Sequence, residues 1–127
     1  MGDAGRIVQI ACEKAEGIGV PMAITIVEPT GDLVHFVKMD GAPYSAIHLA
    51  QQKAIAAARY RRPTQAFYDQ LEGGHAFFLT FPGICAVPGG VLLIEGGMLV
   101  GAIGVSGGNA HQDLLVAEAA VSALLQQ

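Results

Sequence analysis

Apolar residues recur at helical spacing in four parts of the chain, and we predict that each part is a helix. The first covers residues 3–16, with Asp3 positioned to cap it. The second is the alanine-rich stretch 44–59, and a shorter third helix follows with Thr64 as its candidate cap. The fourth covers residues 110–127. Its apolar side consists of Leu114, Ala117, Val121, Leu124 and Leu125.

Short β-rich runs bounded by glycine and proline predict the strands. The predicted strands are residues 22–28, 33–38, 84–87, 91–95 and 98–105. Residues 75–81 fit either a strand or a packed loop. In the first strand Ile24 and Ile26 share one face, with Thr25 on the other. Since strands joined by hairpins form an antiparallel sheet that helices must cover, the predicted fold is an α+β sandwich in one domain, residues 1–127.

The composition adds an expectation about assembly and location. Of the 127 residues, 52% are hydrophobic and only 14% are charged, against about 25% charged in an average protein. A small domain with so few charges is expected to bury surface against copies of itself, so we predict a homo-oligomer. Every apolar run is interrupted before about 18 residues, which argues against a membrane span. No signal-peptide pattern begins the sequence, and a cytoplasmic location is the simplest expectation.

Charge and cysteine content exclude further classes of function. The net charge is −4, and the only basic cluster is residues 59–62. A nucleic-acid site needs a wider basic stripe, so we expect no such partner. Cys12 and Cys85 are isolated and predicted to be reduced. No candidate ligands stand at the spacing of a zinc site, so no metal site is predicted.

The glycine-rich turn at residues 106–108 precedes the last predicted helix, and it has two interpretations. In the first, Ser106 or Asn109 caps that helix and Asp113 satisfies its dipole. In the second, the free N–H groups of the helix end bind an anion, and His111 lies at the rim of a pocket. Both interpretations remain open at this stage.

Other polar residues add candidates for chemistry. Histidines such as His48 and His75 could ligate haem iron or act as an acid or base near neutral pH. Lys53 is the one charge in an apolar helix middle. It either extends its ammonium to solvent or pairs with Asp113 or with a ligand carboxylate.

Two stretches carry a family likeness: "MDGAPYSAIHLAQQKAIAAARYRRPT", residues 39–64, and "VPGGVLLIEGGMLVGAIGVSGGNAHQD", residues 87–113. They resemble the GlcG/HbpS family and are similar to the C-terminal domain of PduO-type cobalamin adenosyltransferases. The resemblance implies a profilin-like fold with a five-stranded antiparallel sheet, assembly into dimers to octamers, and haem binding in some members. The family commonly carries glutamate where this chain has His111.

The function predicted first is a small-molecule or tetrapyrrole (haem or corrinoid) binding module of a catabolic or redox-related pathway. Its pocket would lie between the helix 44–59 and the turn before the last helix, at a subunit interface. Haem is the one candidate cofactor. The candidate ligand-binding residues are Ser45, His48, Lys53, Arg59, His75, Gly89, Gly90, Ser106, Gly107 and Gly108.

Two alternatives stay open. One is a cofactor-free isomerase, hydrolase or lyase that acts on a small organic acid. In that enzyme His111 is the general acid/base, Asp113 orients it, and Lys53 or Arg59 anchors the substrate carboxylate. The other is an accessory oligomer without a ligand.

Overall fold

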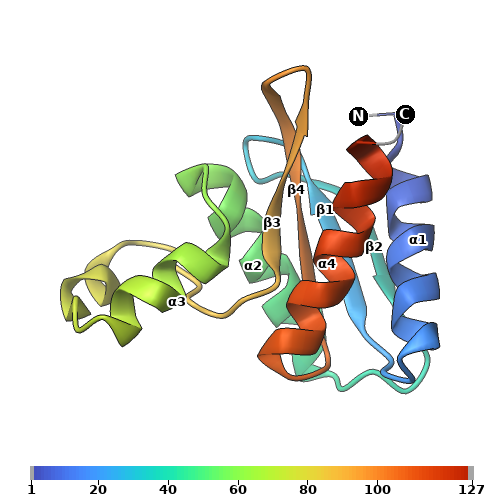
Figure 1. Ribbon diagram of the computed structural model, residues 1–127, viewed down its shortest axis with the longest axis horizontal. Helices are drawn as coiled ribbons and strands as arrows, with labels where there is room; N and C mark the ends of the chain where they lie inside the picture. Colours follow the sequence, from blue (N-terminus) through green and yellow to red (C-terminus); the bar gives the residue numbers. More distant parts are fainter. Residues whose placement is uncertain (1, 126–127) are drawn as a thin grey trace.

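A computed structural model describes residues 2–125 as a sheet with helices on both faces and an arm at one side (Figure 1). The elements are α1 (Ala4–Gly17), β1 (Ala23–Val27), β2 (Leu33–Lys38), α2 (Ser45–Tyr60), α3 (Thr64–Glu72), η1 (Ala76–Thr80), β3 (Gly90–Glu95), β4 (Met98–Ser106) and α4 (Ala110–Leu125). The last two residues of the predicted helix 110–127, and the side chain of Leu125, lie outside the described part.

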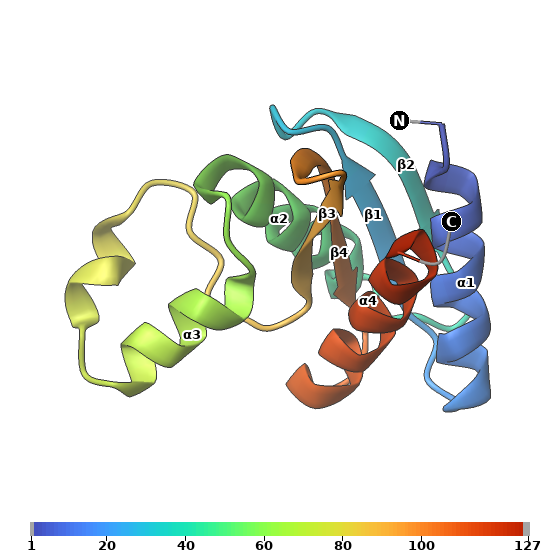
Figure 2. The same ribbon diagram turned by 45° about the horizontal axis from the view of Figure 1, so that its top comes forward.

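The sheet has four strands in the order β2-β1-β4-β3, and all neighbours are antiparallel. Figure 2 shows α2 on one side of the sheet and α1 and α4 on the other. Ile24 and Ile26 of β1 pack toward α1 and α4, as the alternation predicts, and Val27 packs toward the alanines of α2. The α+β class and the antiparallel sheet with flanking helices are therefore confirmed.

The prediction of a fifth strand at residues 84–87 is wrong. The backbone hydrogen bonds of this segment are not made to a strand. Ile84 N donates to Phe81 O within a turn, and Val87 O accepts a hydrogen bond from the Thr64 hydroxyl at 2.6 Å. Residues 75–81, which fitted a strand or a loop, contain the 3₁₀-helix η1. A short apolar run does not reveal its hydrogen-bond partners, and here those partners are not strands.

The helix caps differ in part from the prediction. Asp3 is the N-cap residue of α1 but makes no side-chain cap bond. Thr64 is the first residue of α3 rather than its cap, and its hydroxyl bonds to the segment before β3. At α4 the predicted Asn109 cap is confirmed, because Asn109 Oδ1 accepts from Gln112 N at 2.8 Å. Gln112 Oε1 accepts from Asn109 N at 3.0 Å, which completes a reciprocal capping box.

Residues between α2 and β3 form an arm, defined here as α3, η1 and their connections, that extends away from the sandwich (Figure 1). Aromatic side chains stabilise it. The ring of Phe67 contacts those of Tyr60, Phe78 and Phe81 at centroid distances of 5.2–6.4 Å. Such edge-to-face contacts add to the stability gained by apolar burial, so the arm has a small core of its own.

None of the helices within residues 2–125 is long and apolar enough to cross a bilayer. The cytoplasmic location stays a prediction.

Two buried threonines offer a paired test of the core. Within the described residues, the hydroxyl of Thr25 on β1 has no hydrogen-bond partner, whereas that of Thr64 both donates to Val87 O and accepts from Gly90 N. We expect Thr25→Val to raise the free energy of unfolding by about 1 kcal/mol, because it removes an unsatisfied buried group. Thr64→Val should lower it by about 1–3 kcal/mol. Urea denaturation measures both, and a loss of stability in Thr25→Val would contradict the first expectation.

Candidate functional site

A buried ion pair joins the two predicted halves of the site. Lys53 on α2 is completely buried, and its Nζ lies 2.9 Å from Asp113 Oδ2 in the first turn of α4. The same Nζ donates to Val105 O of β4 at 2.8 Å. Lys53 was predicted either to extend its ammonium to solvent or to pair with Asp113 or a ligand carboxylate. The structure therefore shows the pair with Asp113. One ammonium connects α2, β4 and α4 through these contacts.

Asp113 uses both carboxylate oxygens inside the protein. Oδ1 accepts from Gly108 N at 2.8 Å, while Oδ2 accepts from Lys53. Burial raises the pKa of the Asp113 carboxyl, and the Lys53 hydrogen bond and charge and the Gly108 N–H act in the opposite direction. The helix end that could have bound an external anion thus holds a carboxylate of this chain.

The predicted glycines lie close to this pair, and protein atoms surround them. A Cβ added at Gly89 would lie 3.0 Å from Lys53 Nζ, and one at Gly90 would meet Lys53 O. At Gly107 it would lie 2.7 Å from Pro21 O, and at Gly108 it would lie 2.6 Å from Gln112 Oε1. These glycines therefore allow close packing of main chain and side chains.

His111 and Asp113 do not form an acid–base pair in this structure. They stand two residues apart on α4, a spacing that points side chains away from each other. His111 is exposed and Asp113 is buried, with both of its oxygens occupied by Gly108 and Lys53. The enzyme hypothesis accordingly has no support from this geometry.

The remaining candidates, apart from Ser106, are spread over the surface. Ser45 and His48 lie exposed in the first turn of α2, and Arg59 lies in its last turn, where Nε donates to Thr30 O at 3.3 Å. His75 is exposed and precedes η1. Ser106 is buried at the end of β4, close in sequence to the glycines. Of these candidates only Ser106 lies next to the group around Lys53, as the chain neighbour of Val105, whose carbonyl accepts from Lys53.

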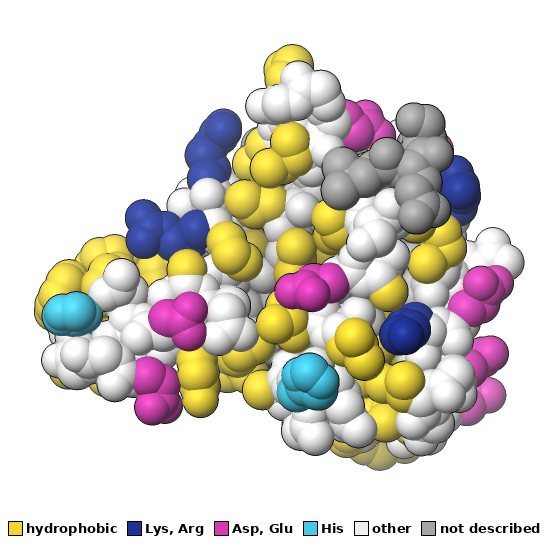
Figure 3. Space-filling model, viewed as in Figure 1, with side chains coloured by type: hydrophobic (Ala, Val, Ile, Leu, Met, Phe, Trp, Pro, Cys, Tyr) yellow, Lys and Arg dark blue, Asp and Glu magenta, His cyan; other side chains and the backbone are white. Residues whose placement is uncertain are grey.

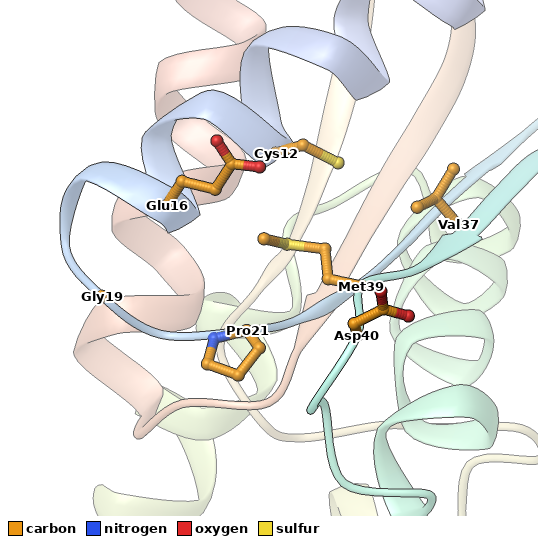
Figure 4. Close-up of a pocket in the computed structure, with 7 residues that line it drawn as sticks. All are labelled: Cys12, Glu16, Gly19, Pro21, Val37, Met39 and Asp40. Atoms are coloured by element: carbon orange, nitrogen blue, oxygen red, sulfur yellow. The ribbon is translucent and has the colours of Figure 1, made fainter.

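A pocket of about 560 Å³ lies elsewhere, between α1 and the end of β2. We call it the α1–β2 pocket. It is lined by Cys12, Glu16, Gly19, Pro21, Val37, Met39 and Asp40 (Figure 4). None of these was among the candidate site residues, although Met39 and Asp40 belong to the "MDGA" part of the family motif. That motif was the one signal in the sequence that could have found the pocket.

The arm carries a second group of exposed side chains. Phe77 is 58% exposed and Leu79 is 65% exposed, both within η1 and close to His75. The guanidinium of Arg62 lies 5.2 Å from the ring centroid of Phe67 at the base of the arm. Figure 3 shows hydrophobic side chains and a histidine on the outer arm, and Lys or Arg side chains near its junction with the body. This surface combines an imidazole, apolar area and positive charge.

Comparison with known proteins gives related sequences and the same fold. Protein GlcG of Escherichia coli K12 is 32% identical over 103 residues, which is 81% of this chain and 77% of GlcG. A structure of PduOC in complex with haem matches with a TM-score of 0.86 and 28% identity, covering 95% of this chain and 91% of that one.

A structure of an HbpS double mutant from Streptomyces reticuli matches with a TM-score of 0.85 and 26% identity. It covers 95% of this chain and 83% of the HbpS chain. The sequence also matches, over residues 1–122, the family described as haem degrading protein HbpS-like. The chain therefore belongs to the HbpS-like family.

Proposed function

We propose that the protein binds a tetrapyrrole, with haem as the first candidate. The observation that supports this most is the likeness to PduOC, whose structure was solved in complex with haem. The likeness covers 95% of this chain at a TM-score of 0.86, so it extends to nearly every element described above. The description of the HbpS-like family as haem degrading supports the same class of ligand.

Side chains of the arm fit such a ligand. His75 is exposed, and a histidine is a common axial ligand of haem iron. Phe77 and Leu79 expose apolar surface against which a macrocycle can pack. Arg62 at the base of the arm offers a guanidinium, which pairs well with carboxylates such as haem propionates. Bound haem would supply an iron whose reactivity depends on its axial ligand.

A haem titration tests the proposal. We expect a saturable Soret shift at stoichiometric haem for the wild-type protein, and its loss or displacement in His75→Ala. His48→Ala and His111→Ala are matched controls, because both residues are exposed histidines on other elements, and they should behave as wild type. Absence of a shift in the wild type would overturn haem binding. Identical spectra for the wild type and His75→Ala would overturn only the role of His75.

We also infer that the chain associates with copies of itself, as its low charge content predicts. Large apolar side chains are exposed at Tyr44, at Ile94 and at Met98, the last two near the tip of the β3–β4 hairpin. We expect a molar mass above that of one chain by light scattering after size exclusion. Met98→Lys should reduce it if the hairpin takes part, with the exposed Glu118→Lys as the control. A monomeric mass at all concentrations would contradict self-association.

A further inference from the structure

We propose that the α1–β2 pocket binds an organic cation, that is, an ammonium compound with an apolar body. This site is separate from the arm, and the proposal does not depend on haem binding. Its volume of about 560 Å³ falls within the range of roughly 300–1,000 Å³ that is usual for small-molecule sites. An isolated ion would leave most of that space empty, so the shape favours a ligand with a carbon skeleton.

The walls of the pocket are largely apolar and held in place. Val37, Pro21 and Met39 contribute carbon and sulfur surface, and the thiol of Cys12 faces the same space (Figure 4). Met39 is held by two hydrogen bonds to Met22: its N donates to Met22 O at 2.9 Å, and its Sδ accepts from Met22 N at 3.4 Å. Because these side chains are already ordered, less conformational entropy is lost on binding, which favours binding of a small ligand.

Two carboxylates supply the charge. Glu16 comes from the last turn of α1 and Asp40 from the turn after β2, and in the close-up Met39 lies between them (Figure 4). Within residues 2–125 neither carboxylate has an ion-pair partner. The neighbouring Lys38 Nζ donates a hydrogen bond to Met39 O at 3.4 Å and lies over the Tyr44 ring. The negative charge at this pocket therefore exceeds the positive charge.

The C-terminal end of α1 and the Cys12 thiol both indicate a negative electrostatic potential at the pocket. The pocket lies at the C-terminal end of α1, where the helix dipole favours a cation. Burial raises the pKa of the Cys12 thiol, and the charges of Glu16 and Glu13 raise it further. The part of this shift that comes from the two glutamates reflects a negative potential at the pocket, which disfavours a bound carboxylate and favours a bound ammonium. Haem, with its propionates, is thus a poor occupant of this pocket.

The test uses two probes of similar shape and opposite charge. We expect 2-phenylethylammonium to bind in calorimetry and to slow the alkylation of Cys12 by iodoacetamide, read from the peptide mass. Its anionic counterpart, 3-phenylpropionate, should do neither. The double variant Glu16→Gln/Asp40→Asn should weaken binding of the ammonium about three- to tenfold, as expected for charge contacts made by two exposed carboxylates.

A matched control removes two other charges. Glu72→Gln/Glu118→Gln changes the net charge equally, at exposed positions on α3 and α4, and should leave binding of the ammonium unchanged. Equal weakening in both double variants, equal binding of the two probes, or no binding to the wild type at millimolar concentration would overturn the proposal. Haem titration in the presence of saturating 2-phenylethylammonium should be unaltered, which keeps this outcome distinct from that of the arm.

Discussion

Asp113→Asn will lower the free energy of unfolding by about 3–5 kcal/mol, the usual cost of leaving a buried charge without its partner. Lys53 is completely buried, and its ammonium would lose its counter-charge. An amide has one acceptor oxygen, so it cannot accept from both Gly108 N and Lys53 Nζ as the two carboxylate oxygens do. Since small domains are stable by about 5–15 kcal/mol, this is a large share of the total. The midpoint and slope of urea denaturation measure it.

Two further variants separate the loss of charge pairing from other effects. Lys53→Met/Asp113→Asn removes both charges, so it should be more stable than Asp113→Asn alone. Glu118→Gln neutralises an exposed carboxylate on the same helix and should change the stability by no more than about 0.5 kcal/mol. An Asp113→Asn protein as stable as the wild type would show that the pair does not hold the helices together.

Gly104→Ala will destabilise the protein by about 3 kcal/mol or more, at or above the upper end of the usual cost of overpacking. Gly104 lies on β4 beneath α2, and an added Cβ would meet Ala50 O and lie 2.6 Å from Ala54 N. These are main-chain atoms of a helix, which cannot rotate away as a side chain can. Helix α2 would have to move off the sheet, and the Lys53 contacts with it.

Gly5→Ala is the matched control for this substitution. Gly5 is exposed in α1, and a Cβ added there meets no atom within 4 Å. Alanine favours the helix and restricts the unfolded chain, so the variant should gain about 0.5–1 kcal/mol. The two glycine substitutions should therefore have effects of opposite sign in thermal or urea denaturation. A Gly104→Ala protein with wild-type stability would contradict the close approach of α2 to β4.

The periodic patterns predicted the long helices well because α1, α2 and α4 each bury a row of apolar residues. The predicted stretch 44–59 differs from α2 by one residue at each end, and the face alternation of β1 is as expected. The segment 84–87 was mistaken for a strand because its residues are apolar, while its main chain bonds to Thr64 and to a turn. Pairing is a property of distant residues, which a local pattern does not contain.

The candidate site was harder to predict for a similar reason. Glycine-rich sequence indicates positive φ or close approach, but it does not say whether protein or ligand comes close. At Gly89 and Gly90 the approaching atoms belong to the protein itself, namely to Val105, Lys53, Asp113 and Thr64. The α1–β2 pocket depends on side chains from three separate segments, such as Cys12, Pro21 and Met39. No spacing rule relates these positions.

The strand order β2-β1-β4-β3 has a consequence for synthesis on the ribosome. Every residue of β1 is buried, yet one of its two neighbours, β4, begins only at Met98. The hairpin of β1 and β2 is made early, and one edge of β1 stays unpaired while residues 39–97, about half of the chain, are translated. Until β4 arrives, that open edge can pair with a neighbouring nascent chain. Completion of the sheet centre is therefore a late, long-range event in the folding of this protein.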